Sequence, residues 1–141
     1  MNRIAIAIRL VLGAIFLYAG IMKAGASEQF ALALVPFTFL PSEWLGTLAA
    51  ALACTEIAAG ILIWLPRVHA VGAALIALLN IVFIGTLSWA LSNGIIVACG
   101  CFGADETPSA FKMLMAVARD IVLLILAVAT IALPRISPRR G

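Results

Sequence analysis

The sequence predicts an all-α integral membrane protein, a four-transmembrane-helix bundle that forms a single membrane domain over residues 1–141. Hydrophobic residues make up 65% of the chain and charged residues only 11%, whereas soluble proteins have about 45 to 50% apolar and about 25% charged residues. Four apolar stretches are also long enough to cross about 30 Å of hydrocarbon, which takes about 20 helical residues. This composition excludes a water-soluble domain, and the net charge of +3 comes with no basic patch typical of nucleic-acid binding.

The predicted spans cover about residues 4–22, 44–65, 68–91 and 111–133. Only Pro66 and Arg67 separate the second span from the third. These two helices must therefore form an antiparallel hairpin, which makes the chain a compact bundle. Small residues such as Gly13 and Gly60 recur in the first two spans, and they predict that these helices approach each other closely.

The segment between the first two spans, about residues 27–42, contains Pro36 and Pro41 around an apolar middle. It is too short and too rich in proline to cross a membrane. We expect a short amphipathic or re-entrant piece at the outer interface, lying as a lid over the mouth of the bundle. An ordinary connecting loop among the lipid head groups explains the same residues equally well.

The basic residues predict the orientation of the bundle. One side carries both termini, the short second connection and the arginines Arg3, Arg9, Arg67, Arg135, Arg139 and Arg140. The other side carries Glu28, Glu43, Asp105 and Glu106, flanked by Lys23 and Lys112. Because excess Lys and Arg marks the cytoplasmic face, we expect cytoplasmic termini in the cytoplasmic (inner) membrane and an outward-facing loop over about residues 92–110.

That loop contains two thiols, Cys99 and Cys101, separated by Gly100. In an extended chain, alpha carbons two residues apart stand roughly 6.5 to 7 Å apart, whereas a disulfide prefers about 5.5 Å, so a bridge here would be strained even with the freedom of glycine. Strain makes a disulfide easier to reduce, and disulfides persist outside the cytoplasm. The pair therefore indicates redox exchange, with Cys99 and Cys101 as the candidate catalytic residues.

Two other interpretations of the thiols stay open. They are either inert or structural, or they bind a soft metal such as Cu(I) or Zn(II) with Cys54, Met113 or Met115 as further ligands. The chain has fewer convergent Cys and His residues than such sites usually need, so no metal ligand is assigned. Cys54 itself lies within the second span, where we expect a buried and unreactive core residue.

Ionisable residues inside the spans are the second candidate site. Each costs several kcal/mol unless it is paired and faces the bundle interior. Helical rise places five polar residues at similar depths, and we expect them to form one nearly neutral buried cluster: Arg9, Glu56, Asn80, Arg119 and Asp120. The cluster either fixes helix pairing or binds a polar head group or relays protons.

Lys23, Glu56 and Arg119 are the candidates for holding a quinone or handling protons. Lys23 ends the first span on the outer side. We expect its ammonium group to snorkel toward the head groups or, alternatively, to favour the thiolate form of a nearby cysteine.

Four motifs together resemble those of DoxX-like membrane proteins, and of the MauE branch in particular. Arg9, Gly13, Phe16, Ala19, Gly20 and Lys23 resemble the R-x3-G-x2-F-x2-A-G-x2-K pattern of the first helix. Glu56 with Gly60 resembles the E-x3-G of the second helix, and Cys99 to Gly103 resembles the C-x-C-F-G of the MauE branch. Arg119-Asp120 resembles the polar pair of the last helix.

MauE proteins are implicated in maturing the disulfide-rich small subunit of methylamine dehydrogenase, with a thioredoxin-like partner, and DoxD relatives are associated with electron transfer from thiosulfate to quinone. The resemblance therefore implies a membrane thiol–disulfide oxidoreductase that has the lipid membrane and an extracytoplasmic thioredoxin-fold protein as partners. A membrane quinone is the candidate cofactor. The alternatives are a non-enzymatic scaffold or maturation factor for a redox partner, and a soft-metal handling protein.

Overall fold

The structure is a computed structural model that describes residues 3–97 and 107–136, the last three by their backbone alone. The described residues are helical with no strand, in the order α1 (Arg3–Gly25), α2 (Ser27–Leu34), the 3-10 helix η1 (Ser42–Trp44), α3 (Leu45–Trp64), α4 (His69–Ser92) and α5 (Ala110–Ile136). Four segments are long and apolar enough to cross a membrane: Arg3–Gly25, Ser42–Trp64, His69–Ser92 and Ala110–Leu133. The predicted all-α bundle with four spans is confirmed.

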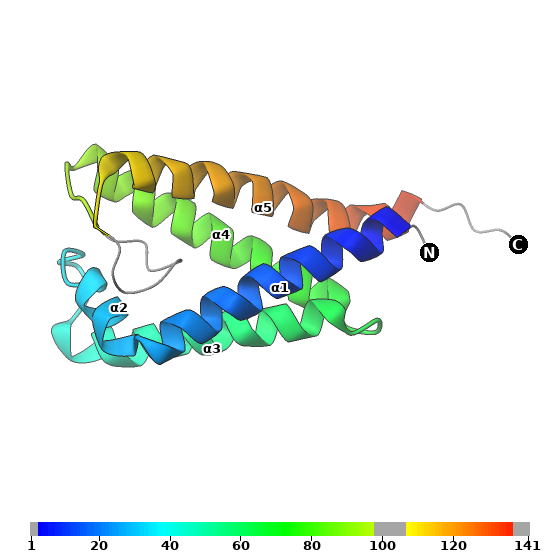
Figure 1. Ribbon diagram of the computed structural model, residues 1–141, viewed down its shortest axis with the longest axis horizontal. Helices are drawn as coiled ribbons and strands as arrows, with labels where there is room; N and C mark the ends of the chain where they lie inside the picture. The colour runs from blue at the N-terminus through cyan, green and yellow to red at the C-terminus, as the bar shows by residue number, and fades with distance from the viewer. Residues whose placement is uncertain (1–2, 98–106, 137–141) are drawn as a thin grey trace, which may run out of the picture.

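The long helices form two pairs, α1 with α3 and α4 with α5, and α3 also packs against α4. Figure 1 shows the pairs meeting at the end that carries both chain termini and the α3–α4 turn, and diverging toward the end that carries α2. We call these the terminal end and the α2 end. Much less of α1 packs against α5 than against α3, which leaves the α1–α5 side of the bundle more open.

Glycines bring the helices of the terminal half close together. A Cβ atom added at Gly60 would lie 2.9 Å from both the Gly13 carbonyl oxygen and the Leu17 nitrogen of α1. One added at Gly72 of α4 would collide with the backbone of Ile63 in α3. The close approach predicted from the small residues is therefore observed, and it needs glycine at these positions.

The buried apolar side chains form two clusters, one toward each end of the bundle. The terminal cluster contains Leu12, Phe16, Ala59, Ile63, Ala73, Ile76, Leu79, Leu123 and Ala127. The α2-end cluster contains Phe37, Leu87, Ala90, Val97, Met113 and Ala116. Between them lies a layer of buried polar residues on α1, α3, α4 and α5.

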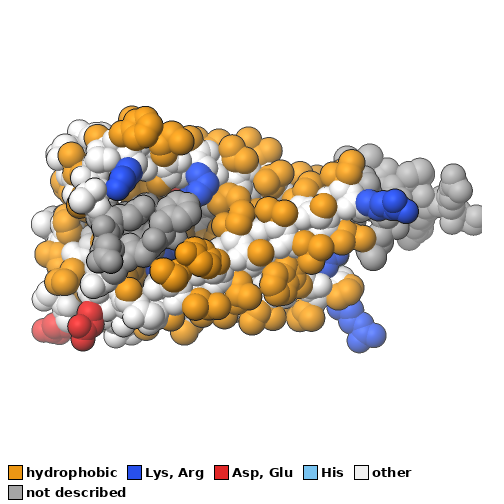
Figure 2. All heavy atoms as spheres, in the orientation of Figure 1, with side chains coloured by type: hydrophobic (Ala, Val, Ile, Leu, Met, Phe, Trp, Pro, Cys, Tyr) orange, Lys and Arg blue, Asp and Glu red, His pale blue; other side chains and the backbone are white. Residues whose placement is uncertain are grey.

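The segment after α1 closes part of the α2 end. The short helix α2 packs against α3, and the turns that follow it carry Phe37 and Phe39 across to Trp89 of α4, with ring centroids 5.7 and 5.6 Å from the Trp89 ring. Figure 2 shows apolar side chains over the long sides of the bundle and acidic side chains at the α2 end. The bundle thus has a lipid-compatible surface and a polar interior layer.

Candidate functional site

A buried ion pair joins α1 to α3. The Lys23 ammonium lies 2.5 Å from Glu56 Oε1, and the two side chains are only 2% and 1% exposed. The same ammonium sits 4.7 Å from the ring centroid of Phe83 and 5.4 Å from that of Phe30, which adds cation–π attraction in a site with little water. The expectation that Lys23 snorkels to the head groups is wrong, because its side chain turns inward to a carboxylate on the neighbouring helix.

A second ion pair lies within α5. Arg119 donates from Nε and from Nη2 to the same oxygen, Asp120 Oδ1, at 3.0 and 2.8 Å. Asp120 is buried, and its other oxygen, Oδ2, has no hydrogen-bond partner within the described part of the chain. One half of this carboxylate is therefore satisfied and the other half is not.

The side chain of Asn80 on α4 likewise has one polar atom with a hydrogen-bond partner and one without a partner among the described residues. Its Nδ2 donates to the Ile76 carbonyl at 2.9 Å. Because only the NH₂ group can donate to that carbonyl, the orientation of the amide is fixed. Oδ1 is left buried, with no donor supplied by residues 3–97 or 107–133.

These residues meet around one cavity, which we call the lateral cavity. It has a volume of about 410 Å³ and is bounded by side chains of α1, α3, α4 and α5. Its polar lining consists of Lys23, Glu56, Asn80, Arg119, Asp120 and the phenol of Tyr18. Tyr18 and Ile15 also line it and are exposed, so the cavity reaches the outer surface of the bundle on the side where α1 and α5 pack least.

The polar layer lies deep in the bundle. At about 1.5 Å per residue, Glu56, Asn80 and Asp120 are roughly 15 to 18 Å from the α2-end termini of their helices. That is near the middle of a hydrocarbon core about 30 Å thick. The four ionisable members, Lys23 and Arg119 against Glu56 and Asp120, carry no net formal charge, as a buried site of this kind requires.

Arg9 is not part of this layer, which corrects the expected cluster. Its Nε donates to the Ile63 carbonyl at 2.9 Å and its Nη2 to the Trp64 carbonyl at 3.4 Å, at the C-terminal end of α3. The last carbonyls of a helix have no partner within the helix, so they capture a guanidinium that enters at their level. Lys23, and not Arg9, is the α1 residue that joins the polar layer. The backbone of Lys23 lies near the α2-end terminus of α1, so its depth did not predict this contact. The long lysine side chain spans the remaining distance to Glu56.

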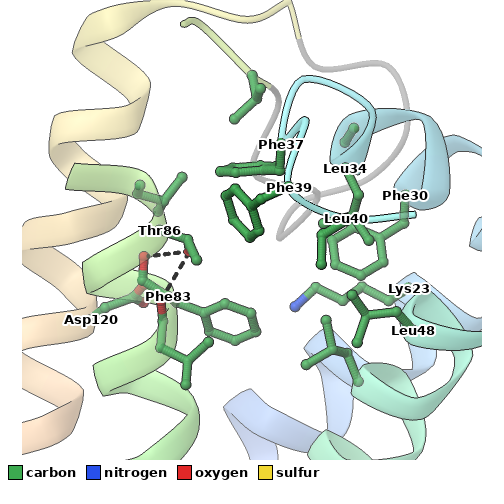
Figure 3. A pocket seen from close by; sticks show the side chains of 15 residues that line it. Lys23, Phe30, Leu34, Phe37, Phe39, Leu40, Leu48, Phe83, Thr86 and Asp120 are labelled. Atoms are coloured by element: carbon green, nitrogen blue, oxygen red, sulfur yellow. Dashed lines mark hydrogen bonds between the residues drawn. The ribbon is translucent and has the colours of Figure 1, made fainter. Parts of the chain in front are cut away.

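A second space, the aromatic cavity, adjoins the first at the α2 end. It has a volume of about 250 Å³ and is lined by Phe30, Phe37, Phe39 and Phe83, by aliphatic side chains, and by Lys23, Thr86 and Asp120. The Thr86 hydroxyl is used within α4, where it donates to the carbonyls of Val82 and Phe83 at 2.9 and 3.1 Å. Figure 3 shows Lys23 reaching into this cavity from α1, with the Phe83 ring between it and Asp120 on the opposite wall.

Lys23, Phe83 and Asp120 line both cavities. The apolar space under α2 and the polar lateral cavity therefore adjoin at these three residues. The shared lining was not visible in the sequence, where Phe83 is one of many apolar residues in a long span and only its three-residue spacing from Asn80 places it beside a polar side chain.

The two candidate catalytic thiols, Cys99 and Cys101, lie outside the described residues. The chain on either side of them is described. Val97 is buried, lines the aromatic cavity and donates its N–H to Met113 Sδ at 3.4 Å, and the description resumes at Thr107 near the start of α5. Both flanks are at the α2 end of the bundle (Figure 1).

Cys54 is described, and its predicted place in the core is wrong. It is a free thiol on the exposed side of α3. The buried stripe of α3 runs through Ala53 and Glu56, and Cys54 falls one residue off that stripe. In the parts of the chain that the structure describes, no group of three or more His, Cys, Asp or Glu side chains is placed to hold a metal ion.

A family model described as "Methylamine utilisation protein MauE" matches residues 1–133 of this chain. No curated protein matches the chain. No solved structure matches it either.

Proposed function

The chain belongs to the MauE family, whose model covers residues 1–133, and we propose that it is a membrane thiol–disulfide redox protein acting in the maturation of methylamine dehydrogenase. In this proposal Cys99 and Cys101 exchange electrons with an extracytoplasmic thioredoxin-fold protein. The feature that carries the proposal is the Cys99-Gly100-Cys101 sequence in the segment between α4 and α5. Its flanks lie at the α2 end, next to the aromatic cavity.

The exchange proceeds through a mixed disulfide. A thiolate of the reduced protein attacks a sulfur of the oxidised one, the second thiol of the attacking pair then resolves the mixed disulfide, and two electrons and two protons pass from dithiol to disulfide. A strained bridge between residues two apart favours such exchange over a structural role. Either protein can start as the donor.

The described residues fit a lipid-soluble quinone as the membrane carrier. The aromatic cavity is apolar apart from Lys23, Thr86 and Asp120, and the lateral cavity reaches the surface of the bundle near its middle. When bound, a quinone supplies an acceptor for two electrons and two protons. Lys23 and Arg119 carry the donor groups that would hold its oxygens, and Glu56 is a buried carboxylate placed to exchange protons beside them.

The proposed orientation has both termini in the cytoplasm and the Cys99/Cys101 segment facing outward across the inner membrane. Arg3 and Arg67 are exposed and belong to the terminal end, and Glu28 and Glu43 are exposed and belong to the α2 end. This distribution agrees with the rule that basic residues stay on the cytoplasmic side.

The test is a redox titration of the Cys99/Cys101 pair in a Cys54→Ser background, read by alkylation mass shift in glutathione or dithiothreitol buffers. We expect a reversible two-electron transition at a potential well above about −300 mV, which marks an exchange pair. Cys99→Ser and Cys101→Ser are the matched controls, because each leaves a single thiol that cannot form the bridge. Thiols that never pair, or a bridge that resists reduction, would contradict the proposal.

Two alternatives remain distinguishable. A non-enzymatic scaffold for a redox partner would support maturation even when both cysteines are replaced by Ser, whereas an exchange protein would not. A soft-metal handler would retain copper or zinc in a cysteine-dependent way after purification under reducing conditions.

A further inference from the structure

Two buried oxygen atoms in the lateral cavity accept no hydrogen bond from the described residues. They are Asn80 Oδ1 and Asp120 Oδ2, on side chains that are only 1% and 2% exposed. Both residues line the lateral cavity. A buried acceptor without a donor costs about 1 to 3 kcal/mol, so such atoms usually have a partner that is supplied from elsewhere.

The hydrogen bonds that these side chains do make explain why the two atoms without any partner in the described part of the chain are acceptors. One N–H of the Asn80 amide donates to the Ile76 carbonyl, and Asp120 Oδ1 receives both hydrogen bonds from Arg119. The remaining lone pairs call for O–H or N–H groups. A ligand whose oxygens only accept hydrogen bonds would leave both atoms unsatisfied.

Charge and shape narrow the ligand further. The lining already balances two cations with two anions, so an ionised head group would add a net charge to a site near mid-bundle, whereas a neutral one would not. The volume of about 410 Å³ is within the range of small-molecule sites. The aromatic lining residues Phe16, Tyr18 and Phe83 suit a flat ring, and the exposed lining residues Ile15 and Tyr18 give access from the lipid side.

We propose that the lateral cavity binds a neutral, lipid-soluble hydroquinone, whose hydroxyl groups supply the donors that Asn80 and Asp120 lack. The redox role of this ligand rests on the proposed function. What the inference adds is the redox state of the carrier that the cavity binds more tightly, the hydroquinone. Oxidation of the Cys99/Cys101 dithiol by the bound quinone produces the hydroquinone. Tighter binding of the hydroquinone therefore shifts the equilibrium in the site toward oxidation of the dithiol. In that direction the dithiol loses two electrons and two protons and becomes a disulfide, and the carrier gains them.

The first test compares ligands on the unmodified full chain in phosphatidylcholine nanodiscs. The probes are an alkyl-substituted benzohydroquinone, its di-O-methyl ether and the corresponding quinone, and the readout is the dissociation constant from equilibrium binding. We expect the hydroquinone to bind about tenfold or more tightly than the ether, which has the same ring and tail but no O–H group. An ether or quinone that binds as tightly as the hydroquinone would overturn the proposal.

The second test replaces one acceptor by a branched apolar side chain. Asn80→Leu is expected to weaken hydroquinone binding about tenfold and to leave ether binding nearly unchanged. The matched control is Thr130→Val, which removes a buried hydroxyl of α5 that donates to Leu126 and does not line the cavity. Equal losses for both ligands in Asn80→Leu would mean a general packing effect and would contradict the proposal. Should this variant fail to fold, the ligand comparison on the unmodified chain still decides.

A lipid head group with hydroxyls is the other possible source of donors. Replacing phosphatidylcholine by phosphatidylglycerol in the nanodiscs distinguishes a lipid head group from a hydroquinone as the ligand. A glycerol head group that occupied the cavity would abolish hydroquinone binding, and this result would overturn the assignment. Unchanged affinity supports it. Failure here is distinct from failure of the proposed function, since the redox titration of Cys99 and Cys101 needs no carrier.

Discussion

The terminal half of the bundle and the half that carries α2 differ in how the α1–α3 pair packs against the α4–α5 pair. In the terminal half, Gly13, Gly60 and Gly72 let α1, α3 and α4 touch through their backbones, and apolar side chains fill what remains. Toward the α2 end α1 stays close to α3, where a Cβ atom added at Gly20 would lie 2.9 Å from the Ile57 nitrogen, but the α1–α3 pair diverges from the α4–α5 pair (Figure 1). Two cavities and a layer of buried charges lie in this half. The difference indicates that close packing in the terminal half stabilises the fold. The α2 half contains cavities and buried charged groups, which lower the stability.

The largest expected effect comes from breaking the ion pair that joins α1 to α3. Glu56→Leu leaves the Lys23 ammonium buried without its carboxylate, and we expect it to lower the free energy of unfolding by about 3 to 5 kcal/mol. Thermal or denaturant unfolding in detergent measures this. The double variant Lys23→Met with Glu56→Leu removes both charges and should recover most of the loss, because the desolvation cost disappears with the pair. A single variant as stable as the parent would show that the pair does not hold the two helices together.

The next effect tests the packed half of the comparison. Gly60→Val places side-chain atoms where the backbone of α1 runs, so we expect a loss of about 1 to 3 kcal/mol and separation of α1 from α3. Gly85→Val is the matched control on α4, because a Cβ atom there would meet nothing within 4 Å. Similar stabilities for the two variants would mean that the close approach is not needed.

How much of this architecture follows from the sequence can be judged from particular residues. The four spans could be predicted because each is long and apolar. The outward position of Cys54 was also predictable, because Glu56 is expected to face the interior and two residues are about 200° apart around a helix; the apolar character of α3 on all sides hides this signal. The Lys23–Glu56 pair was missed because helical rise gives the depth of an alpha carbon, while a lysine places its charge several bonds away. The Cys99/Cys101 pair stays a prediction.

A smaller effect on the free energy of unfolding is expected from Arg9, which bonds the end of α3 and lies outside the polar layer. Arg9→Met removes the donors to the Ile63 and Trp64 carbonyls, and we expect a loss of about 1 kcal/mol. Because Arg9 donates to carbonyls at the end of α3, at least seven residues from Glu56, whereas Glu56 pairs with Lys23, their effects should add within about 0.5 kcal/mol in the double variant with Glu56→Leu. Strong coupling between the two substitutions would return Arg9 to the cluster that the sequence suggested.

The smallest effect concerns the thiol that the structure places outside the core. Cys54→Ser should change the free energy of unfolding by no more than about 0.5 kcal/mol, because the side chain is exposed on α3 and fills no cavity. Ala53→Ser is the matched comparison, since it adds a hydroxyl one residue away at a position that is only 2% exposed, against the glycine face of α1. If Cys54→Ser proves the more damaging of the two, the buried stripe of α3 is rotated by one residue, and the ion pair through Glu56 would have to be reassigned with it.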